Sequence, residues 1–151
     1  MRKTHTPAEV FAQLADVWQT ARGNRTMPAR TDINPAQAGA ALQYVALIDV
    51  IPGNPVDFRY RLIGQHLIDS YGRNVTGALH SELTHDRPQR PGYDAFLRCV
   101  ETKTPQEATA EFRNHNDTPC RADVRVWPLS DDGSRVTGLL AACIYLKIED
   151  I

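Results

Sequence analysis

The sequence predicts an α+β fold, with one antiparallel sheet of five strands and helices gathered on one face. Residues 58–63 alternate apolar side chains with arginines, the period-two pattern of a strand with one buried face. The last third of the chain reads as three strands separated by clusters of turn residues. Two runs, residues 44–51 and 139–148, are almost continuously apolar, as in central strands covered on both faces. The first and last strands are therefore expected to be neighbours.

The chain is expected to begin with an amphipathic helix. Thr6, Pro7 and Glu9 form a helix start, because threonine caps the first turn, proline suits its first position and glutamate completes a capping box. Gly23 and Asn24 end the helix. Apolar residues recur between them at helical spacing and make a stripe along one side. The stripe consists of Val10, Phe11, Leu14, Val17 and Trp18.

Two ways to cover this apolar stripe are open. It packs either on the sheet of its own chain or on a second copy of the chain. We predict a homodimer that uses the stripe as its interface. The chain then divides into an N-terminal amphipathic helix at residues 1–23 and a sheet domain at residues 24–151, within one globular unit overall.

The next segment predicts a short helix and a hairpin. Asn34 is a helix cap followed by proline, and it starts a short helix over about Pro35–Leu42. Residues 52–55 form a turn cluster of two prolines, glycine and asparagine. This turn predicts an antiparallel pair between the apolar strand 44–51 and the strand 58–63, in which Phe58, Tyr60 and Leu62 share the buried face.

The middle of the chain is expected to be helical. Gly64 breaks the second strand, and the apolar spacing over Leu67–Tyr71 predicts a short helix that ends at Gly72. A loose polar stretch follows. Apolar residues at spacings of three and four then predict a longer helix over Tyr93–Val100, which stops before Pro105.

The last third predicts the three-stranded meander. Its strands are expected at residues 107–115, 121–129 and 139–148, and the turns between them at residues 116–119 and 130–134. Side chains in the first two of these strands alternate between apolar and polar, whereas the last strand is apolar throughout. The last strand is therefore the most deeply buried of the three.

Length, charge and hydropathy exclude several classes of protein. The 151 residues suit one domain, and the net charge of −1 leaves no basic excess to bind nucleic acid. No apolar run approaches the roughly 20 residues that span a bilayer, and the first residues lack the apolar core of a signal peptide. We therefore predict a cytoplasmic protein without membrane insertion. Its three cysteines, Cys99, Cys120 and Cys143, are expected to be free thiols.

Several local motifs occur in an order that resembles a known family. They are W-x-x-A-R at residues 18–22, PARTDINP at 28–35, LIDVI at 47–51, FRYRLIG at 58–64, YGRNVTG at 71–77 and WPLSDDGS at 127–134. Together they resemble a PAS domain, from a bacterial subfamily of short chains that often lack an attached output domain. The resemblance covers about residues 18–146. It implies the strand order 2-1-5-4-3 and a sensory or regulatory module that binds a small molecule, a protein, or both.

No motif points to catalysis or to a metal. The chain has no Gly-x-Ser-x-Gly nucleophile elbow and no phosphate-binding loop, so we do not expect an enzyme. If it were one, Asp69 or Glu111 would be the first carboxylates to test as a general acid or base. His80, His85 and His115 lack the spacing of metal ligands and are interpreted as solvated loop histidines, so no metal site is predicted.

The sequence does not name a cofactor. Some PAS relatives bind haem through a helical histidine, which makes His66, His80 and His85 the residues to consider, with His80 favoured. Flavin photochemistry requires a reactive cysteine between asparagine and arginine on a helix. Cys99 and Cys120 both lack those neighbours, so this chemistry is not expected, and both are interpreted as small buried hydrophobic residues.

The resemblance places a pocket between the sheet and the segment from His66 to Val100. The residues predicted to line it are Tyr60, His66, Tyr71, His80, Phe96 and Phe112. The strands also carry the arginines Arg59, Arg61, Arg113 and Arg125. These arginines either lie on a solvated sheet surface, which we favour, or point inward to hold an anionic ligand.

These features predict a non-catalytic, cytoplasmic PAS-type module for signal transduction. It would bind a small molecule, a signalling protein, or both, and would signal by a shift in partner binding rather than by a reaction. A ligand-free adaptor that oligomerises is the alternative, favoured if apolar side chains fill the inner face. A small α+β enzyme is the third possibility.

Overall fold

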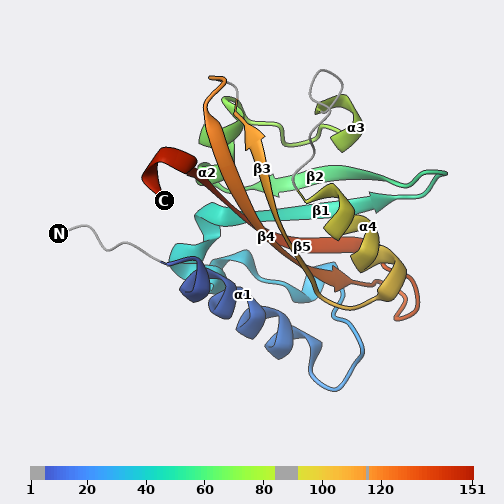
Figure 1. Cartoon of the computed structure of the whole chain (residues 1–151). Coiled ribbons are helices and arrows are strands. Elements are labelled where there is room, and N and C mark those ends of the chain that lie inside the picture. The colour runs from blue at the N-terminus through green and yellow to red at the C-terminus, as the bar shows by residue number, and fades with distance from the viewer. Residues whose placement is uncertain (1–5, 84–91, 115) are drawn as a thin grey trace.

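The computed structural model describes residues 6–83, 92–114 and 116–151 of the chain. Its centre is one five-stranded antiparallel sheet in the order β2-β1-β5-β4-β3 (Figure 1). The strands are β1 (Val45–Ile51), β2 (Asp57–Ile63), β3 (Gln106–Arg113), β4 (Pro119–Leu129) and β5 (Gly138–Lys147). The predicted fold class, strand order and placement of the first strand beside the last are confirmed.

The central pair, β1 and β5, does not run to the same end. Val45 at the start of β1 pairs with Ala142, and no β1 residue pairs further along β5. On the other side, β4 pairs with β5 as far as Lys147. The segment Cys143–Lys147, which we call the β5 overhang, therefore extends past the end of β1. The short helix α2 (Gln65–Tyr71) contacts β5 and lies close to this end of the sheet.

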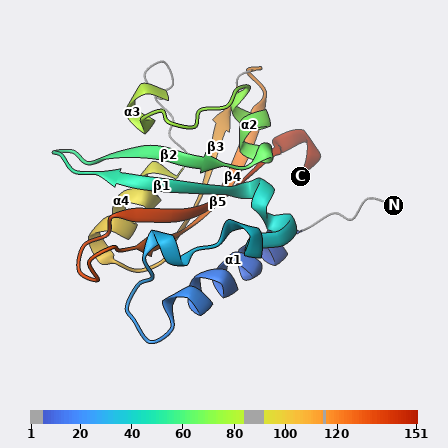
Figure 2. The ribbon, with the colours of Figure 1, turned by 180° about the vertical axis from the view of Figure 1, so that it is seen from behind.

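Helical elements cover both faces of the sheet. The other elements are α1 (Pro7–Arg22), η1 (Arg30–Asp32), η2 (Pro35–Tyr44), α3 (His80–Leu83), α4 (Tyr93–Thr102) and η3 (Ile148–Asp150), where η marks a 3-10 helix. α2, α3 and α4 pack on one face, called inner here, and α1 and η2 pack on the outer face (Figures 1 and 2). The helices after β2 are thus gathered on one face as predicted, and the N-terminal helix covers the opposite face. No helix in the described part of the chain is long and apolar enough to cross a membrane.

Alternate side chains of the central strands enter two separate cores. In β1, Ile48 belongs to the inner core and Leu47 to the outer core. In β5, Ala141 faces inward and Leu140 outward. Since successive side chains of a strand point to opposite faces, a strand that is buried on both sides must be apolar at every position. This explains the two continuous apolar runs in the sequence.

The second strand departs from the predicted alternation. Leu47 pairs with Leu62, whereas the next residue, Ile48, pairs with Tyr60, so Arg61 is an extra residue in a β-bulge. The bulge reverses the alternation, and Tyr60 enters the inner core while Leu62 packs against the outer one. The expectation that these two residues share a face is therefore wrong. The apolar and polar residues of this strand alternate in the sequence whether or not a bulge is present, so the sequence alone does not reveal it.

The apolar stripe of α1 is buried by its own sheet. Thr6 caps the helix by accepting the N–H of Glu9, as predicted. The indole N–H of Trp18 donates to the carbonyl of Pro128 in β4 at 2.8 Å, across a buried contact. Packing on the chain's own sheet therefore accounts for Trp18 and for the other buried members of the stripe. These are Val10, Leu14 and Val17.

Phe11, the remaining stripe residue, lies at the edge of this contact. It is half-buried, and the guanidinium of Arg125 stands 5.0 Å from the centre of its ring. A cation in this position over an aromatic face is favourable. The part of the stripe that reaches solvent is thus small, and a homodimer would have to use more of the surface than these five side chains.

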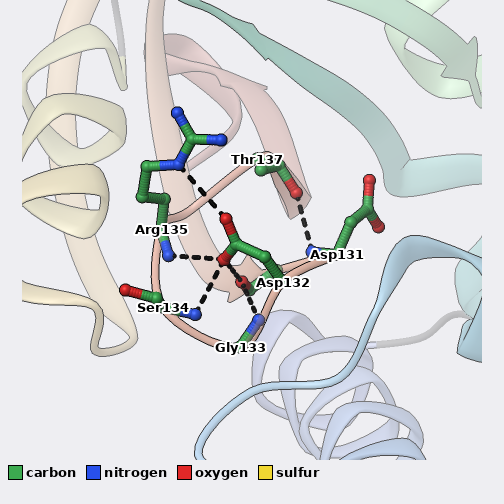
Figure 3. Close-up of polar contacts among 7 residues, drawn as sticks. Asp131, Asp132, Gly133, Ser134, Arg135 and Thr137 are labelled. Atoms are coloured by element: carbon green, nitrogen blue, oxygen red, sulfur yellow. Dashed lines mark hydrogen bonds and ion pairs between the residues drawn. The ribbon is translucent and has the colours of Figure 1, made fainter.

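The loop between β4 and β5 is organised by one carboxylate (Figure 3). Asp132 accepts the backbone N–H groups of Arg135 and Ser134, both at 2.8 Å, and pairs with the Arg135 guanidinium at 3.2 Å. These interactions, led by the backbone N–H of Arg135, lower the pKa of Asp132. The predicted turn at residues 130–134 is therefore a closed, hydrogen-bonded loop.

Candidate functional site

A cluster of aromatic rings lies between the inner face and the helices above it. Phe58 is its centre, with the ring of Phe96 at 5.3 Å, Tyr93 at 5.9 Å and His80 at 6.4 Å, all edge to face. His80 stacks on Tyr93 at 5.2 Å. These residues, with Tyr60, form what we call the Tyr60–His80 cluster, and they come from β2, α3 and α4.

The backbone beside β2 sets the position of His80. The N–H of Tyr60 donates to the carbonyl of Ala78 at 3.1 Å, and the N–H of Gly77 donates to the carbonyl of Tyr60 at 2.7 Å. The chain therefore runs along the free edge of β2 and turns into α3 at His80. This pairing brings the side chain of His80 next to that of Tyr60, although the two residues are far apart in the sequence.

Tyr60 and His80 form a buried polar contact. The Tyr60 hydroxyl and the Nδ1 of His80 share a hydrogen bond of 2.7 Å. The two residues are only 3% and 4% exposed. Burying a polar group is costly unless it is hydrogen-bonded, so each of the two residues offsets the cost of burying the other. The interpretation of His80 as a solvated histidine of a polar loop is wrong, because α3 turns its side chain into the inner core.

Asp57 fixes the start of α3 from the first residue of β2. Its carboxylate accepts the N–H and the hydroxyl of Ser81 and the N–H of Phe58. Partial burial alone would raise the pKa of Asp57, but the hydrogen bonds from Ser81 and Phe58, with His80 nearby, outweigh it and lower the pKa. A carboxylate that stays ionised thus holds α3 against β2.

A second group of aromatic rings lies beside the Tyr60–His80 cluster on the inner face. Tyr145 on β5 lies 5.3 Å from Phe112 on β3, 6.3 Å from Tyr71 on α2 and 5.9 Å from His66 on α2. Tyr71 in turn lies 6.4 Å from Tyr60, which joins this Tyr145 cluster to the Tyr60–His80 cluster. Burial first, and proximity to Tyr71 second, raise the pKa values of Tyr60 and Tyr145 well above normal, so both phenols stay neutral.

The residues predicted to line a pocket fall into these two clusters. Tyr60, His80 and Phe96 belong to the first, and Tyr71, Phe112 and His66 lie around Tyr145. Their role in binding a ligand stays a prediction. Three further ring partners were not among the residues predicted to line the pocket, although the sequence placed the first on a buried strand face and the second in a helix, and marked the third as part of a possible aromatic patch. The three are Phe58, Tyr93 and Tyr145.

The profile of one protein family, described as PAS domain, matches residues 5–141. The chain is a PAS domain. Among solved structures it is similar to the light state of the blue-light photoreceptor Aureochrome1 LOV, with a TM-score of 0.50 and 13% identity over 72% of this chain and 84% of that one. It is also similar to the Rhodobacter sphaeroides LOV protein, with a TM-score of 0.51 and 12% identity over 93% of this chain and 69% of that one. At these identities the likeness concerns the fold alone. No curated protein sequence matches significantly.

The strand arginines of this PAS domain do not enter the inner face. Arg61 pairs with Asp49, and Arg125 pairs with Glu107 at 2.9 Å on the sheet's other side. Arg59 donates to the carbonyl of Gly77 at 2.7 Å, along the strand edge. Arg113 contacts the turn that follows β3. The favoured interpretation of a solvated surface therefore fits all four arginines, and none is placed to hold an anion among the inner rings.

Other reactive groups are solvent-exposed or chemically unreactive. Asp69 and Glu111, the carboxylates named for an enzyme, are both exposed. Burial raises the pKa of the Cys99 thiol on α4 and of the Cys143 thiol on β5 to about 12, so neither is a thiolate near neutral pH. Cys120, at the start of β4, is buried as well, so both cysteines interpreted as buried hydrophobic residues are placed that way.

The PAS domain offers no obvious metal centre in its described residues. There, His, Cys, Asp and Glu side chains do not gather in groups of three that could hold an ion. His85 and His115, considered as ligands from the sequence, lie outside the described residues. For haem, His80 would be the axial candidate. A porphyrin there would have to displace the rings of Tyr93 and Phe58, which now enclose the imidazole.

Proposed function

We propose that this PAS domain is a non-catalytic, cytoplasmic sensory module that binds a small molecule on its inner face. The observation that carries the proposal is the buried Tyr60–His80 hydrogen bond of 2.7 Å inside an otherwise aromatic cluster. A ligand that replaces one partner of such a bond gains a strong, oriented contact, while planar rings on either side favour a flat, largely apolar molecule. The neutral phenols and the outward arginines argue against an anionic ligand.

The proposed signal is a shift of α3 relative to β2. α3 is held to β2 by the Tyr60–His80 bond inside the core and by Asp57 at its start. A ligand that takes over the Tyr60 hydroxyl would release one of these two ties. Since a ligand shifts a conformational equilibrium only through different affinity for the two states, the affected surface around α3 is where a signalling partner would read the change.

A ligand-free adaptor is the second candidate function. The observation in its favour is the close packing of the inner rings, whose centres lie 5.2 to 6.4 Å apart in the Tyr60–His80 cluster. Rings at such distances make favourable contacts with one another. An adaptor would then act through its surface, as a homodimer or with another protein.

Native mass spectrometry of freshly purified protein, compared with the denatured sample, distinguishes the two. A ligand gives extra mass in the native spectrum only, and Tyr60→Phe should raise its dissociation constant by about 2- to 13-fold if the hydroxyl contributes a typical hydrogen bond of about 0.5–1.5 kcal/mol. Phe11→Leu, on the outer face of the sheet, is the control and should keep the ligand. The same spectra give the mass of the assembly and so test the expected homodimer.

The proposal is abandoned if the wild-type protein carries no extra mass and a set of planar aromatic compounds leaves its melting temperature unchanged. Equal loss of ligand in Tyr60→Phe and Phe11→Leu would also count against this site, because it would indicate a general loss of stability. Urea unfolding of both variants measures that loss directly.

A further inference from the structure

His66 connects α2 to the sheet by a hydrogen bond to the backbone. Its Nε2 accepts the N–H of Tyr145 in β5 at 3.0 Å. Tyr145 lies in the β5 overhang, where β4 still pairs with one edge of the strand but β1 no longer pairs with the other. The imidazole thus occupies the place of the missing β1 residue. This N–H is partly buried, and such a group needs a partner because leaving a buried donor unpaired costs up to about 1–3 kcal/mol.

The surroundings hold the ring in this position. The Tyr44 ring, from η2, lies 4.7 Å away on one side, and the Tyr145 ring is stacked at 5.9 Å with an angle of 13°. The Ser70 hydroxyl donates to the backbone carbonyl of His66 at 2.8 Å, which secures the turn of α2 that carries it. The N–H of Gly64, just before α2, donates to the carbonyl of Val45 at 2.8 Å.

We propose that His66 is a pH-operated latch, which ties α2 to the β5 overhang when its imidazole is neutral and releases it when the imidazole is protonated. As an acceptor, Nε2 must carry a lone pair, so the single proton of the neutral ring is on Nδ1. Protonation at Nε2 turns the acceptor into a donor that faces another donor, the N–H of Tyr145. The hydrogen bond is lost, and α2 is then held to the sheet by its remaining contacts alone.

The groups around the ring place the transition on the acid side of neutrality. Burial lowers the pKa of His66, and the Asp69 carboxylate on the same helix offsets part of that effect. From η2 and β5 the ring is faced by Tyr44 and Tyr145, and the phenol of Tyr145 stays neutral. A histidine whose pKa is lower in the folded state stabilises the fold above the unfolded value of 6.5. That contribution disappears as the pH falls through the folded pKa.

The latch is tested by NMR on the ligand-free protein, and it does not depend on the proposed ligand. The amide of Tyr145 and the Cε1–H of His66 are followed from about pH 7.5 to about pH 5, with hydrogen-exchange protection measured at each pH. In the wild type, both signals should titrate with one midpoint below 6.5. Protection of the Tyr145 amide should fall about tenfold, as expected for the loss of one hydrogen bond to a partly buried donor. The amide of Ala141, which belongs to the part of β5 paired with β1, is the internal control.

Two variants separate the latch from ordinary packing. His66→Gln keeps an acceptor oxygen that does not titrate, so its Tyr145 amide should stay protected over the whole range. His66→Phe keeps a ring without an acceptor, so the same amide should be unprotected at every pH. The latch is refuted if His66 titrates while the Tyr145 amide does not respond, or if His66→Gln loses protection with the same midpoint as the wild type. Should His66→Phe fail to fold, the wild type and His66→Gln still decide the matter.

Discussion

At the scale of single residues, hydrogen bonds from the surrounding backbone hold the charged carboxylate of Asp132 in one geometry. Asp132 is exposed, yet the backbone N–H groups of Arg135 and Ser134 and the Arg135 guanidinium lower its pKa (Figure 3). A carboxylate whose pKa is lower in the folded state stabilises the fold above its unfolded value of 3.8, and the contribution disappears as the pH falls through the folded pKa. The ionised carboxylate of Asp132 therefore stabilises the folded loop.

This argument predicts the effect of removing the charge. Asp132→Ala should lower the free energy of unfolding near neutral pH, whereas its difference from the wild type should shrink in strong acid, where both lack the charge. The difference should begin to shrink below pH 3.8, where the unfolded chain takes up the proton before the folded one does. Urea unfolding at about pH 7 and at about pH 2 measures the two differences. Asp131→Ala, next to it in the same loop, is the control and should have a smaller effect, since Asp131 contributes a backbone N–H to the loop (bonded to Thr137). A constant difference across pH would contradict the assigned role.

The cysteines give a second prediction at this scale. All three are buried, and burial raises the pKa values of Cys99 and Cys143 to about 12. Because the thiolate is the reactive form, the native protein should react with a thiol reagent at about pH 8 far more slowly than free cysteine does. All three thiols should react at once in denaturant. Rapid labelling of a single cysteine in the native protein would reveal an exposed thiol and would overturn this picture.

Sequence reasoning located the inner-face residues only through resemblance to PAS domains. It named Tyr60, His80 and Phe96, which the structure brings together, but it gave no reason for the bond between Tyr60 and His80. That bond depends on the pairing of the chain with the free edge of β2, and no local pattern encodes such pairing. Leu62 was misplaced for a similar reason, because a β-bulge leaves no mark on an alternating sequence.

At the scale of elements, glycine residues mark the ends of helices and strands, and this made those ends predictable from the sequence. Gly72 ends α2 in the left-handed conformation, with φ of 85°, as the sequence predicted. Gly64, which was interpreted only as a strand breaker, has a further reason: a Cβ there would overlap the carbonyl oxygens of Leu42 and Gln43 at the end of η2. Among the α-helices of the described residues, α3 was not placed from the sequence, since four residues starting at His80 carry too little periodicity to predict it.

The close approach at Gly64 predicts a severe effect of a small change. Gly64→Ala should cost about 3 kcal/mol or more, because backbone atoms of η2 have to move to admit one methyl group. Gly133→Ala is the matched control: its Cβ would meet open space, and only its φ of 79° would cost stability, about 1–2 kcal/mol. Thermal and urea unfolding of both variants measure the difference. Equal losses would mean that η2 and α2 are not in tight contact.

At the scale of the molecule, the sheet is covered on both faces, and this decides what α1 does. The sequence predicted α1, its cap and its apolar stripe, but it left open whether the stripe faces the chain's own sheet or a second copy. The deciding fact was not local. Only the position of β4 and β5 shows that Leu14 and Trp18 have partners in the same chain, such as the carbonyl of Pro128. That β1 and β5 are neighbours was predictable, because two wholly apolar strands must be central, and the full strand order was implied by the resemblance to PAS domains.

If α1 packs in the core of its own chain, the free energy of unfolding of the protein should not depend on protein concentration. Leu14→Ala should then lower the free energy of unfolding by about 2–5 kcal/mol, the usual cost of a cavity at a buried leucine, and Leu14 is only 1% exposed. Urea unfolding at two protein concentrations, about fiftyfold apart, gives the same midpoint for a stripe that packs within the chain. Ala12→Gly, on the exposed side of the same helix, controls for helix propensity and should cost about 1 kcal/mol. A midpoint that rises with concentration in the wild type, and no longer does so in Leu14→Ala, would instead assign the stripe to a dimer. Light scattering on the same samples would then show the wild type at twice the mass of the variant.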